Sequence, residues 1–441
     1  MVKGERPDGA VHRGLRMGKL GLSLTGSYLG YQLQNLFLGA EARKEKRRRF
    51  GQKASRRVRE ELEFLKGPFM KLGQLLSMQT HALPHEAIDE LANLQMRAPG
   101  MHPTLARAQF KTSCGKYPED VFREFEEEAF AAASLGQVHR AVTRRGEKVA
   151  VKIQYPAIRT AIENDLKVLR SATLPGRITG HTPGGILDEM KRGFLEETDY
   201  INEGRNIDFF REQMKGFPYL TIPKVYWDLT TDRVLTMSFV EGETIAPFLE
   251  TRPSQAVRNR IGCRLFELYL FQIHHLHALH ADPHPGNYLF RNDGRIGLVD
   301  FGCVKRFSAD VAELNRYVAD RVWLQGQEQL ERMIVLIWGP NVSAAKARKM
   351  LAVFEEFANT LFPLPGTTRP LVDFGKPTLL NALGRNLRTA VRDRLTNPEF
   401  AFISRAELGL YNLLHQLQAR VNTREVWNRV AGPKWGIASK T

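Results

Sequence analysis

The stretch HADPHPGNYLF, residues 280–290, and the stretch LVDFG, residues 298–302, place two aspartates and an asparagine in a fixed order. Asp282 precedes Asn287 with four residues between them, and Asp300 is followed by Phe-Gly. In phosphoryl transfer from a nucleotide, an aspartate spaced in this way orients or deprotonates the nucleophile, and the asparagine and the second aspartate hold Mg²⁺. The two stretches therefore predict a catalytic Asp282 and the metal ligands Asn287 and Asp300.

A lysine that contacts the α- and β-phosphates of ATP is the next requirement of this chemistry. VAVK ends at Lys152 in a segment whose alternation predicts short strands, with a turn at Arg145-Gly146. Either VAVK or DFG alone is no more than an ordinary strand or turn. Their order, with Lys152 first and the paired Asp and Asn before DFG, is what indicates a kinase-like site.

The periodicity around these motifs predicts an α+β, protein kinase-like fold with two lobes. A small β-rich lobe is expected first and a larger helical lobe after Gly242. Inside the helical lobe, Asn287–Phe290 and Ile296–Val299 predict a β-hairpin turned at Asn292-Asp293-Gly294. The segments expected in the small lobe are three strands within Glu126–Gln154, a helix over Ile186–Met214, and strands over Thr221–Trp227 and Arg233–Val240.

Four stretches resemble the UbiB/ADCK family of atypical kinases, also called ABC1-type. They are KLGQ at Lys71–Gln74, FAAASLGQVHRA at Phe130–Ala141, EETDYINEGRN at Glu196–Asn206, and HADPHPGN with VDFG. The resemblance extends from about Leu62 to Arg306. Gly204 departs from the alanine that relatives usually carry.

The resemblance implies further site residues. An Ala-rich loop, Ala131, Ala132, Ala133, Ser134 and Gly136, takes the place of the Gly-rich loop that covers the phosphates in typical kinases. Because alanine restricts the backbone more than glycine does, this loop is expected to be stiffer.

Acidic residues complete the expected site. Glu203 is expected to pair with Lys152, and Glu241, after the last strand of the small lobe, is assigned to the nucleotide site. By resemblance, Lys71 of the KxGQ motif lies near Glu197 and Asp199 of the ExD motif. The KxGQ helices then form an N-terminal helical extension that covers the cleft where a peptide would otherwise lie.

The predicted domain organisation follows from these assignments. The expected parts are an amphipathic and basic segment at residues 1–50, the helical KxGQ extension at 51–125, the kinase-like N-lobe at 126–240 with a helical insert at about 156–191, and the helical C-lobe at 241–441.

Two absences argue against a peptide substrate. Ala281 stands before Asp282, where protein kinases have arginine, and no Ala-Pro-Glu follows DFG before the helical pattern of Asp310–Trp323. The segment that binds a peptide is therefore expected to be missing or short. A small or lipid-like acceptor, or ATP hydrolysis, is the expected use of ATP and Mg²⁺, and the acceptor itself is not indicated.

Charge and composition favour a membrane surface over nucleic acid. The formal net charge is +16, and Arg43–Arg59 holds ten Lys or Arg against one acid, Glu45. Without a nucleic-acid motif, an anionic membrane is the favoured partner, with an ordinary solvated helix face as the alternative. The uncharged stretch Leu20–Gly39 is too polar to span a bilayer and predicts an amphipathic helix that packs on a membrane, a partner or the protein itself.

A cytoplasmic protein, peripheral on the inner face of a membrane, fits these features best. Three isolated cysteines indicate a reducing compartment, and no run near the end of the chain is long enough to span a membrane. The resemblance implies ubiquinone or other isoprenoid-lipid metabolism, with quinone or isoprenoid lipids and lipid-biosynthesis proteins as partners. The oligomeric state is not indicated.

Two alternatives remain open at this stage. His274, His275, His277, His280 and His284 surround Asp282, and such a cluster can hold the metal of a hydrolase, although packed helix histidines are the more common explanation. Metallohydrolase chemistry leaves Lys152, Glu203 and DFG unexplained. A non-catalytic scaffold that senses ATP or ADP for lipid-handling partners is the second alternative.

Overall fold

The computed structural model describes residues 101–133, 135–156, 158–160, 163, 195–282, 284–338, 351, 355–363, 371–377, 379–381 and 398–431. The predictions made for Leu20–Gly39, the basic stretch Arg43–Arg59, Lys71 and Ser134 lie outside these residues, as does nearly all of the predicted insert.

Two compact units make up the described chain. The first contains the described residues up to Asn202 together with Val225–Phe239, and the second contains Glu203–Lys224 and the described residues from Val240 onward. The second unit begins inside a helix, since α9 covers Tyr200–Gln213.

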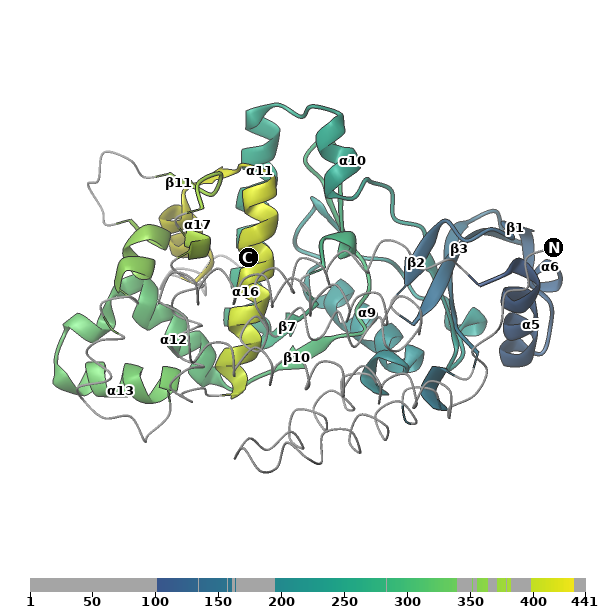
Figure 1. The fold of residues 1–441 in the computed structure, drawn as a ribbon, viewed down its shortest axis with the longest axis horizontal. Helices are drawn as coiled ribbons and strands as arrows, with labels where there is room; N and C mark the ends of the chain where they lie inside the picture. Colours follow the sequence, from purple (N-terminus) through teal and green to yellow (C-terminus); the bar gives the residue numbers. More distant parts are fainter. Residues whose placement is uncertain are drawn as a thin grey trace, which may run out of the picture. The chain divides into compact units, whose positions relative to one another are not determined.

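An antiparallel five-stranded sheet forms the first unit (Figure 1). The order is β1-β3-β4-β6, and β2 pairs with the other end of β3. The strands are β1 Phe122–Phe125, β2 Ala131–Ala133, β3 Gly136–Thr143, β4 Lys148–Gln154 and β6 Val234–Ser238. The three strands predicted before Gln154 and their turn at Gly146, whose φ is +86°, are therefore present.

Alternating burial along β3 explains how the sheet is covered. Gln137, His139, Ala141 and Thr143 are buried on one face, and the residues between them are more exposed. Helix α5, Pro103–Cys114, contacts β4 and β6, and its Phe110 packs with Phe122 in the core. The short helix α6, Pro118–Val121, leads directly into β1. In β4 every residue after Lys148 is buried, so this strand lies at the centre of the unit.

The strand predicted over Thr221–Trp227 does not form as one element. Strand β5 covers Leu220–Thr221 and belongs to the second unit, and a 3₁₀ turn occupies Trp227–Leu229. Pro223 explains the break, because proline has no N–H for a ladder hydrogen bond. Val225 keeps a single bridge to Met237 of β6.

The second unit is mainly helical, as predicted. Three small sheets accompany the helices, with the orders β5-β9-β8, β10-β7 and β11-β12. The predicted hairpin is β8–β9, turned at Gly294 with φ +85°. Besides most of α9, the helices are α10 Ile245–Glu250, α11 Gln255–Phe271, α12 Ala309–Asp320, α13 Gln327–Trp338, α16 Pro398–Gln416 and α17 Thr423–Val430. The strands are β5, β7 Ala278–His280, β8 Tyr288–Phe290, β9 Ile296–Leu298, β10 Val304–Arg306, β11 Val372–Asp373 and β12 Arg420–Val421.

Helix α11 is the central element of this unit and contacts α16, α17 and β12 (Figure 1). Ser254 caps its first turn by accepting a hydrogen bond from the Val257 N–H. Its last turn widens into a π-helix at Gln272–Leu276, and His277 then adopts a left-handed conformation with φ +47°. This sharp ending directs the chain into β7 and onward to Asp282.

A buried acid joins α11 to α16. The Tyr269 hydroxyl donates a hydrogen bond of 2.6 Å to Glu407 Oε1, and both side chains are buried. Burial raises the pKa of Glu407 from 4.5 to about 7, although the tyrosine hydrogen bond opposes the shift. The side chain therefore keeps its proton in the folded protein at mildly acidic pH, whereas the unfolded chain releases it.

The pH dependence of stability tests this assignment. Because the folded pKa lies above the unfolded one, the contribution of Glu407 is fully present below pH 4.5 and is lost as the pH rises to about 7. Relative to Glu407→Gln, the wild type should lose about 3 kcal/mol of unfolding free energy between pH 4.5 and 8, measured by urea titration. The exposed Glu250→Gln serves as the control, and parallel curves for wild type and Glu407→Gln would contradict the prediction.

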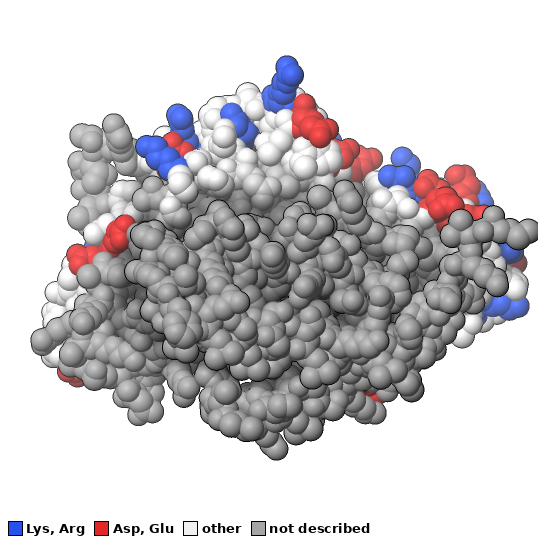
Figure 2. Space-filling view, in the orientation of Figure 1, with Lys and Arg blue, Asp and Glu red and all other residues white. Residues whose placement is uncertain are grey.

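On the face shown in Figure 2, the basic and acidic side chains of described residues lie beside one another. Arg332 contacts both Asp310 and Glu313, each at 3.0 Å. The positive charge on this part of the surface is therefore not gathered into one patch. Among the helices whose residues are described, none is long and apolar enough to cross a membrane.

Candidate active site

Asp282 and Asn287 lie side by side in the loop between β7 and β8. Pro285 starts a 3₁₀ turn that ends at Asn287, and this turn brings the asparagine back toward the aspartate. The Asn287 amide donates a hydrogen bond of 2.9 Å to Asp282 Oδ2, and the His284 N–H donates one of 3.3 Å to Oδ1. With its amide NH₂ directed at Asp282, Asn287 keeps its carbonyl oxygen for another ligand.

Asp300 follows β9 and occupies the left-handed region, with φ +61°. That conformation costs about 1–2 kcal/mol for a residue other than glycine, so surrounding contacts must hold it. His280 Nε2 donates to the Asp300 carbonyl over 2.8 Å, and the Gly302 N–H donates to Asp300 Oδ1 over 3.3 Å. The Val299 N–H donates to the Asn287 carbonyl at 3.0 Å and joins the two loops.

Phe301 is fully buried beneath this loop. Its ring packs against His280 at 5.1 Å and against Phe210 of α9 at 5.2 Å, between ring centroids. Its carbonyl accepts a hydrogen bond of 3.1 Å from the Asn206 amide of α9. Side chain and backbone of Phe301 are therefore both held by α9.

The chain after Gly302 is short, as predicted. Strand β10 pairs with β7, so that Val304 lies opposite His280, and the Ala281 N–H donates to the Cys303 carbonyl. Helix α12 begins at Ala309, which leaves Cys303–Ser308 in place of the long peptide-binding segment of protein kinases.

Lys152 is on β4 in the first unit and is 5% exposed. Its Nζ atom lies 5.1 Å from the centre of the Tyr200 ring, within range of a cation–π interaction. Val138 is its direct neighbour across the sheet. Glu203 on α9 is 1% exposed and belongs to the second unit, so its pairing with Lys152 stays a prediction.

The Ala-rich loop is a tight hairpin. Ala131, Ala132 and Ala133 form β2 and pair with Val138, Gln137 and Gly136. The Leu135 carbonyl accepts a hydrogen bond from the Tyr155 N–H, which fastens the turn to the chain just after β4.

Gly136 is required here because the backbones approach closely. A Cβ atom at Gly136 would lie 2.3 Å from the Ile153 carbonyl oxygen and 2.8 Å from Tyr200 Oη.

The two ExD residues lie just before α9. Asp199 is exposed, and its Oδ1 accepts a hydrogen bond of 2.9 Å from the Asn202 N–H, so it caps the start of the helix. Glu197 is half-buried in the preceding turn. The Thr198 carbonyl between them accepts from the Gln154 amide at 3.0 Å, which joins the motif to the end of β4.

Glu241 forms an ion pair with Arg291, at 3.2 Å between Oε2 and Nη1. Both side chains are exposed, so the pair adds little stability. The side chain predicted for the nucleotide site is thus directed at the arginine that follows β8.

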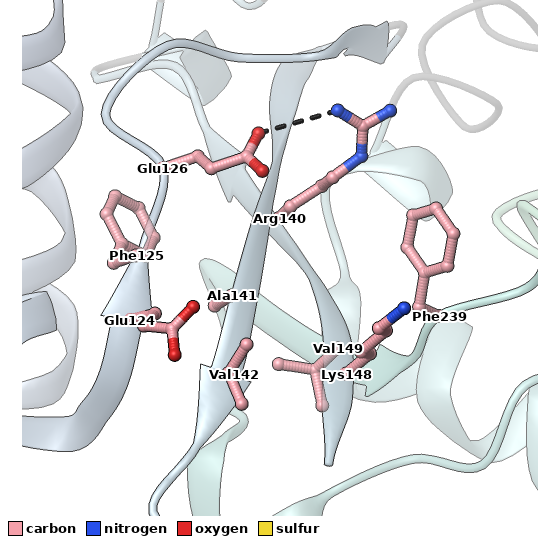
Figure 3. Close-up of a pocket in the computed structure, with 9 residues that line it drawn as sticks. All are labelled: Glu124, Phe125, Glu126, Arg140, Ala141, Val142, Lys148, Val149 and Phe239. Atoms are coloured by element: carbon pink, nitrogen blue, oxygen red, sulfur yellow. Dashed lines mark hydrogen bonds and ion pairs between the residues drawn. The ribbon is translucent and has the colours of Figure 1, made fainter. Parts of the chain in front are cut away.

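A hollow of about 470 Å³ opens on the first unit's sheet (Figure 3). Arg140, Lys148 and Phe239 line it together with Glu124 and Glu126. Lys148 and Lys152 share one face of β4, because they are four positions apart and side chains alternate along a strand. Lys148, at the edge of the hollow, therefore lies about 13 Å from Lys152 along β4.

Comparison with known proteins identifies the family of this chain. The ABC1 atypical kinase-like domain matches residues 93–328, more than half of the chain. The chain belongs to this family. ABC1 is the UbiB/ADCK family that the motifs resemble, and its kinase-like fold is the α+β fold described above.

Individual ABC1 relatives agree with the assignment. The chain is 39% identical over 249 residues to the chloroplastic ACTIVITY OF BC1 COMPLEX KINASE 7 of Arabidopsis thaliana, covering 56% of this chain and 36% of the relative. It is 32% identical over 261 residues to AarF domain-containing protein kinase 1 of Mus musculus, covering 59% of this chain and 50% of the relative. The matched part thus spans only about a third to a half of these relatives.

A solved structure with the same fold is the Rv3197–erythromycin complex from Mycobacterium tuberculosis. The TM-score is 0.60 and the sequence identity 25%, and the alignment covers 88% of this chain and 98% of that chain.

The ABC1 assignment agrees with the packing of the histidines. In the described part of the chain, no three His, Cys, Asp or Glu side chains gather where they could hold a metal ion. Burial lowers the pKa of His274 to about 4, and its ring packs edge-on against Trp427 at 4.9 Å. His275 Nε2 bonds the Val430 carbonyl. The geometry of these histidines is that of packed helix residues, and it gives the metallohydrolase alternative no support.

Sequence reasoning missed two contacts, that of the Asn206 amide with the Phe301 carbonyl in the second unit and that of the Tyr200 ring with Lys152 in the first. Asn206 and Tyr200 both lie in the quoted stretch Glu196–Asn206, but their partners are distant in sequence: Asn206 bonds a residue 95 positions away. One signal was available for Asn206. It follows Glu203 by three residues, so the two side chains share a face of the helix.

Proposed function

We propose that this protein binds Mg·ATP and uses it for phosphoryl transfer to a small or lipid-like acceptor, or for ATP hydrolysis. The observation that carries the proposal is the arrangement of Asp282, Asn287 and Asp300 in two joined loops of the second unit. Family membership supports a kinase-like enzyme, and the finer assignment rests on these residues.

The donor set fits Mg²⁺. Asp300 supplies a carboxylate and Asn287 an amide oxygen, and hard oxygen ligands are those that Mg²⁺ prefers. Asn287 is oriented by its hydrogen bond to Asp282, and Asp300 by the bonds to its carbonyl and to Oδ1. Bound Mg²⁺ would neutralise charge on the phosphates.

The protein's own side chains have distinct roles in this proposal. Asp282 accepts the proton of the attacking hydroxyl or water. Lys152 contacts the α- and β-phosphates from the sheet face that also carries Val138 and Ala150, where a base can pack. The hairpin Ala131–Gly136 covers the phosphates in this proposal, and the pairing of Glu203 with Lys152 stays a prediction from the sequence.

The short link after Gly302 supports a non-peptide acceptor, because a peptide has no segment to bind there. We place the activity in ubiquinone or other isoprenoid-lipid metabolism at a membrane surface. That placement comes from the family resemblance, and the basic stretch Arg43–Arg59 is the feature of this chain that suits an anionic membrane.

Nucleotide turnover tests the proposal directly. Full-length protein would be assayed for ADP and phosphate release with Mg·ATP, alone and with neutral or anionic vesicles. We expect Mg²⁺-dependent binding and slow release, increased by anionic vesicles at low salt and less so at high salt. Lys152→Ala is the inactive control.

Other outcomes of this assay have definite meanings. Tight Mg·ATP binding without release in any condition would favour the nucleotide-sensing scaffold over an enzyme. Failure to bind Mg·ATP at all would overturn the proposal.

Replacing Ala132 with glycine is expected to change nucleotide affinity. Ala132 lies in β2 opposite Gln137, and the added backbone freedom costs about 0.5–1 kcal/mol in strand stability while it admits more loop conformers around ATP. The measurement is ADP and ATP affinity together with incorporation of phosphate into the protein, with Lys152→Ala as the control. A variant that equals wild type in all three would mean that the hairpin is a passive connection.

A further inference from the structure

The loop that carries Asp300 is bonded through three of its carbonyl groups. The Asp300 carbonyl accepts from His280, the Phe301 carbonyl from Asn206, and the Cys303 carbonyl from the Ala281 N–H. His280 is the last residue of β7 and Ala281 follows it directly. Asn206 lies on α9. Asn206 is therefore the one of these three donors that comes from the helix bearing Glu203.

The buried Asn206 side chain is directed at the Phe301 carbonyl. It is 8% exposed, and its Nδ2 atom lies 3.1 Å from the Phe301 carbonyl oxygen. One turn further along α9, Phe210 packs against the Phe301 ring. The helix therefore contacts Phe301 at the backbone and at the side chain, immediately beside the strained φ of Asp300.

We propose that Asn206 is a positioning residue that holds the Asp300 carboxylate in its metal-binding orientation. The inference rests on the proposed function, because it assigns a ligand role to Asp300. An apolar side chain at position 206 would leave a buried carbonyl without its donor, which is unfavourable in the folded state. The Phe301 peptide would then tend to rotate toward another donor. The backbone of Asp300, strained at its positive φ, is the neighbouring residue that can relax with it, and this would turn the Asp300 carboxylate.

The bond also ties the loop that carries Asp300 to the helix that carries Glu203. Glu203 and Asn206 are three residues apart and move together with α9. A displacement of the helix that carried Glu203 away would also release the Phe301 carbonyl. In protein kinases a long segment after DFG controls these positions, whereas here only Cys303–Ser308 lies between Gly302 and α12.

Metal affinity, measured apart from turnover, tests the role of Asn206. The full chain would be titrated with Mn²⁺ in the presence of ADP, and free Mn²⁺ measured by electron paramagnetic resonance. Asn206→Leu should weaken Mn²⁺ binding by about 10–100-fold, the range seen when an outer partner of a metal ligand is removed. ADP affinity without divalent ions should stay within about twofold of wild type.

Matched variants separate positioning from general damage. Asn202→Leu makes the same chemical change one turn earlier on α9, at a half-buried position, and should leave Mn²⁺ affinity unchanged. Asn206→Asp keeps the side-chain volume but loses the amide donor, and it should weaken Mn²⁺ binding as Asn206→Leu does. If Asn206→Leu does not fold, the Asn206→Asp result decides.

The outcomes for the two proposals are distinguishable. If wild type binds Mn·ADP and either folded Asn206 variant binds it within about twofold as well, the positioning role is wrong and the proposed function stands. If wild type itself shows no Mn²⁺-dependent ADP binding, the proposed function has failed and the inference falls with it.

Discussion

Asp300→Asn is expected to lower the affinity for Mg·ADP by at least about 100-fold, because it removes the one full negative charge offered to the cation by the Asn287–Asp300 pair. The fold should survive, since asparagine tolerates the left-handed conformation that Asp300 adopts at φ +61°. Asparagine can also keep the hydrogen bond from the Gly302 N–H through its carbonyl oxygen. Isothermal titration with and without Mg²⁺ measures the loss.

A control aspartate lies close by in the chain. Asp293 sits in the β8–β9 turn, where its Oδ1 accepts from the Arg295 N–H and its Oδ2 pairs with Arg291 at 3.3 Å. Asp293→Asn should leave Mg·ADP affinity unchanged. If Asp300→Asn also bound Mg·ADP as wild type does, the metal site would have to be sought elsewhere in the molecule.

Gly136→Ala is expected to destabilise the first unit by about 3 kcal/mol, near the upper end of the usual cost of overpacking. The new methyl group would meet the Ile153 carbonyl oxygen at 2.3 Å, and that oxygen belongs to the central strand, which cannot move aside cheaply. Because Gly136 closes the hairpin over Ala131–Ala133, nucleotide binding should fall as well. Urea denaturation and ADP titration measure the two effects.

Two further variants locate the cause of this effect. Gly216→Ala introduces the same methyl group where no atom lies within 4 Å, and it should be close to neutral. Tyr200→Phe removes the hydroxyl that would lie 2.8 Å from the new Cβ but leaves the Ile153 carbonyl in place. Most of the loss of stability should therefore persist when Gly136→Ala and Tyr200→Phe are combined. Stability close to wild type for Gly136→Ala alone would refute the prediction.

The parts of the site that sequence could predict are local ones. Asp282, Asn287 and Asp300 lie within one loop–hairpin–loop segment, so their spacing and the Gly294 turn largely determine how they meet. The stretch Ala131–Gly136 was expected by resemblance as a loop, and in the structure Ala131–Ala133 instead form β2 and pair with β3. In each case the chain returns to itself within about twenty residues.

The remainder depended on packing between distant segments. The helix face that Asn206 shares with Glu203 did not indicate that its amide bonds the Phe301 carbonyl. Asp199 caps α9, and its expected proximity to Lys71 stays a prediction because Lys71 lies outside the described residues. The prediction of one strand over Thr221–Trp227 was wrong, and the sequence itself shows why. Pro223 has no N–H and interrupts the strand hydrogen bonds there. The catalytic, metal-binding and nucleotide-binding roles of all the predicted site residues stay predictions.

The burial of Phe301 bears on how the protein would respond to small molecules. In protein kinases the packing of the DFG phenylalanine sets the active or inactive state, so a compound that displaces this ring would block activity. Here that ring is fully buried against His280 and Phe210, and its own carbonyl is bonded to Asn206. An inhibitor of that kind would have to break the hydrogen bond and open the aromatic cluster before it gained any contact. Selective compounds for this chain are therefore better sought among those that leave the phenylalanine in place.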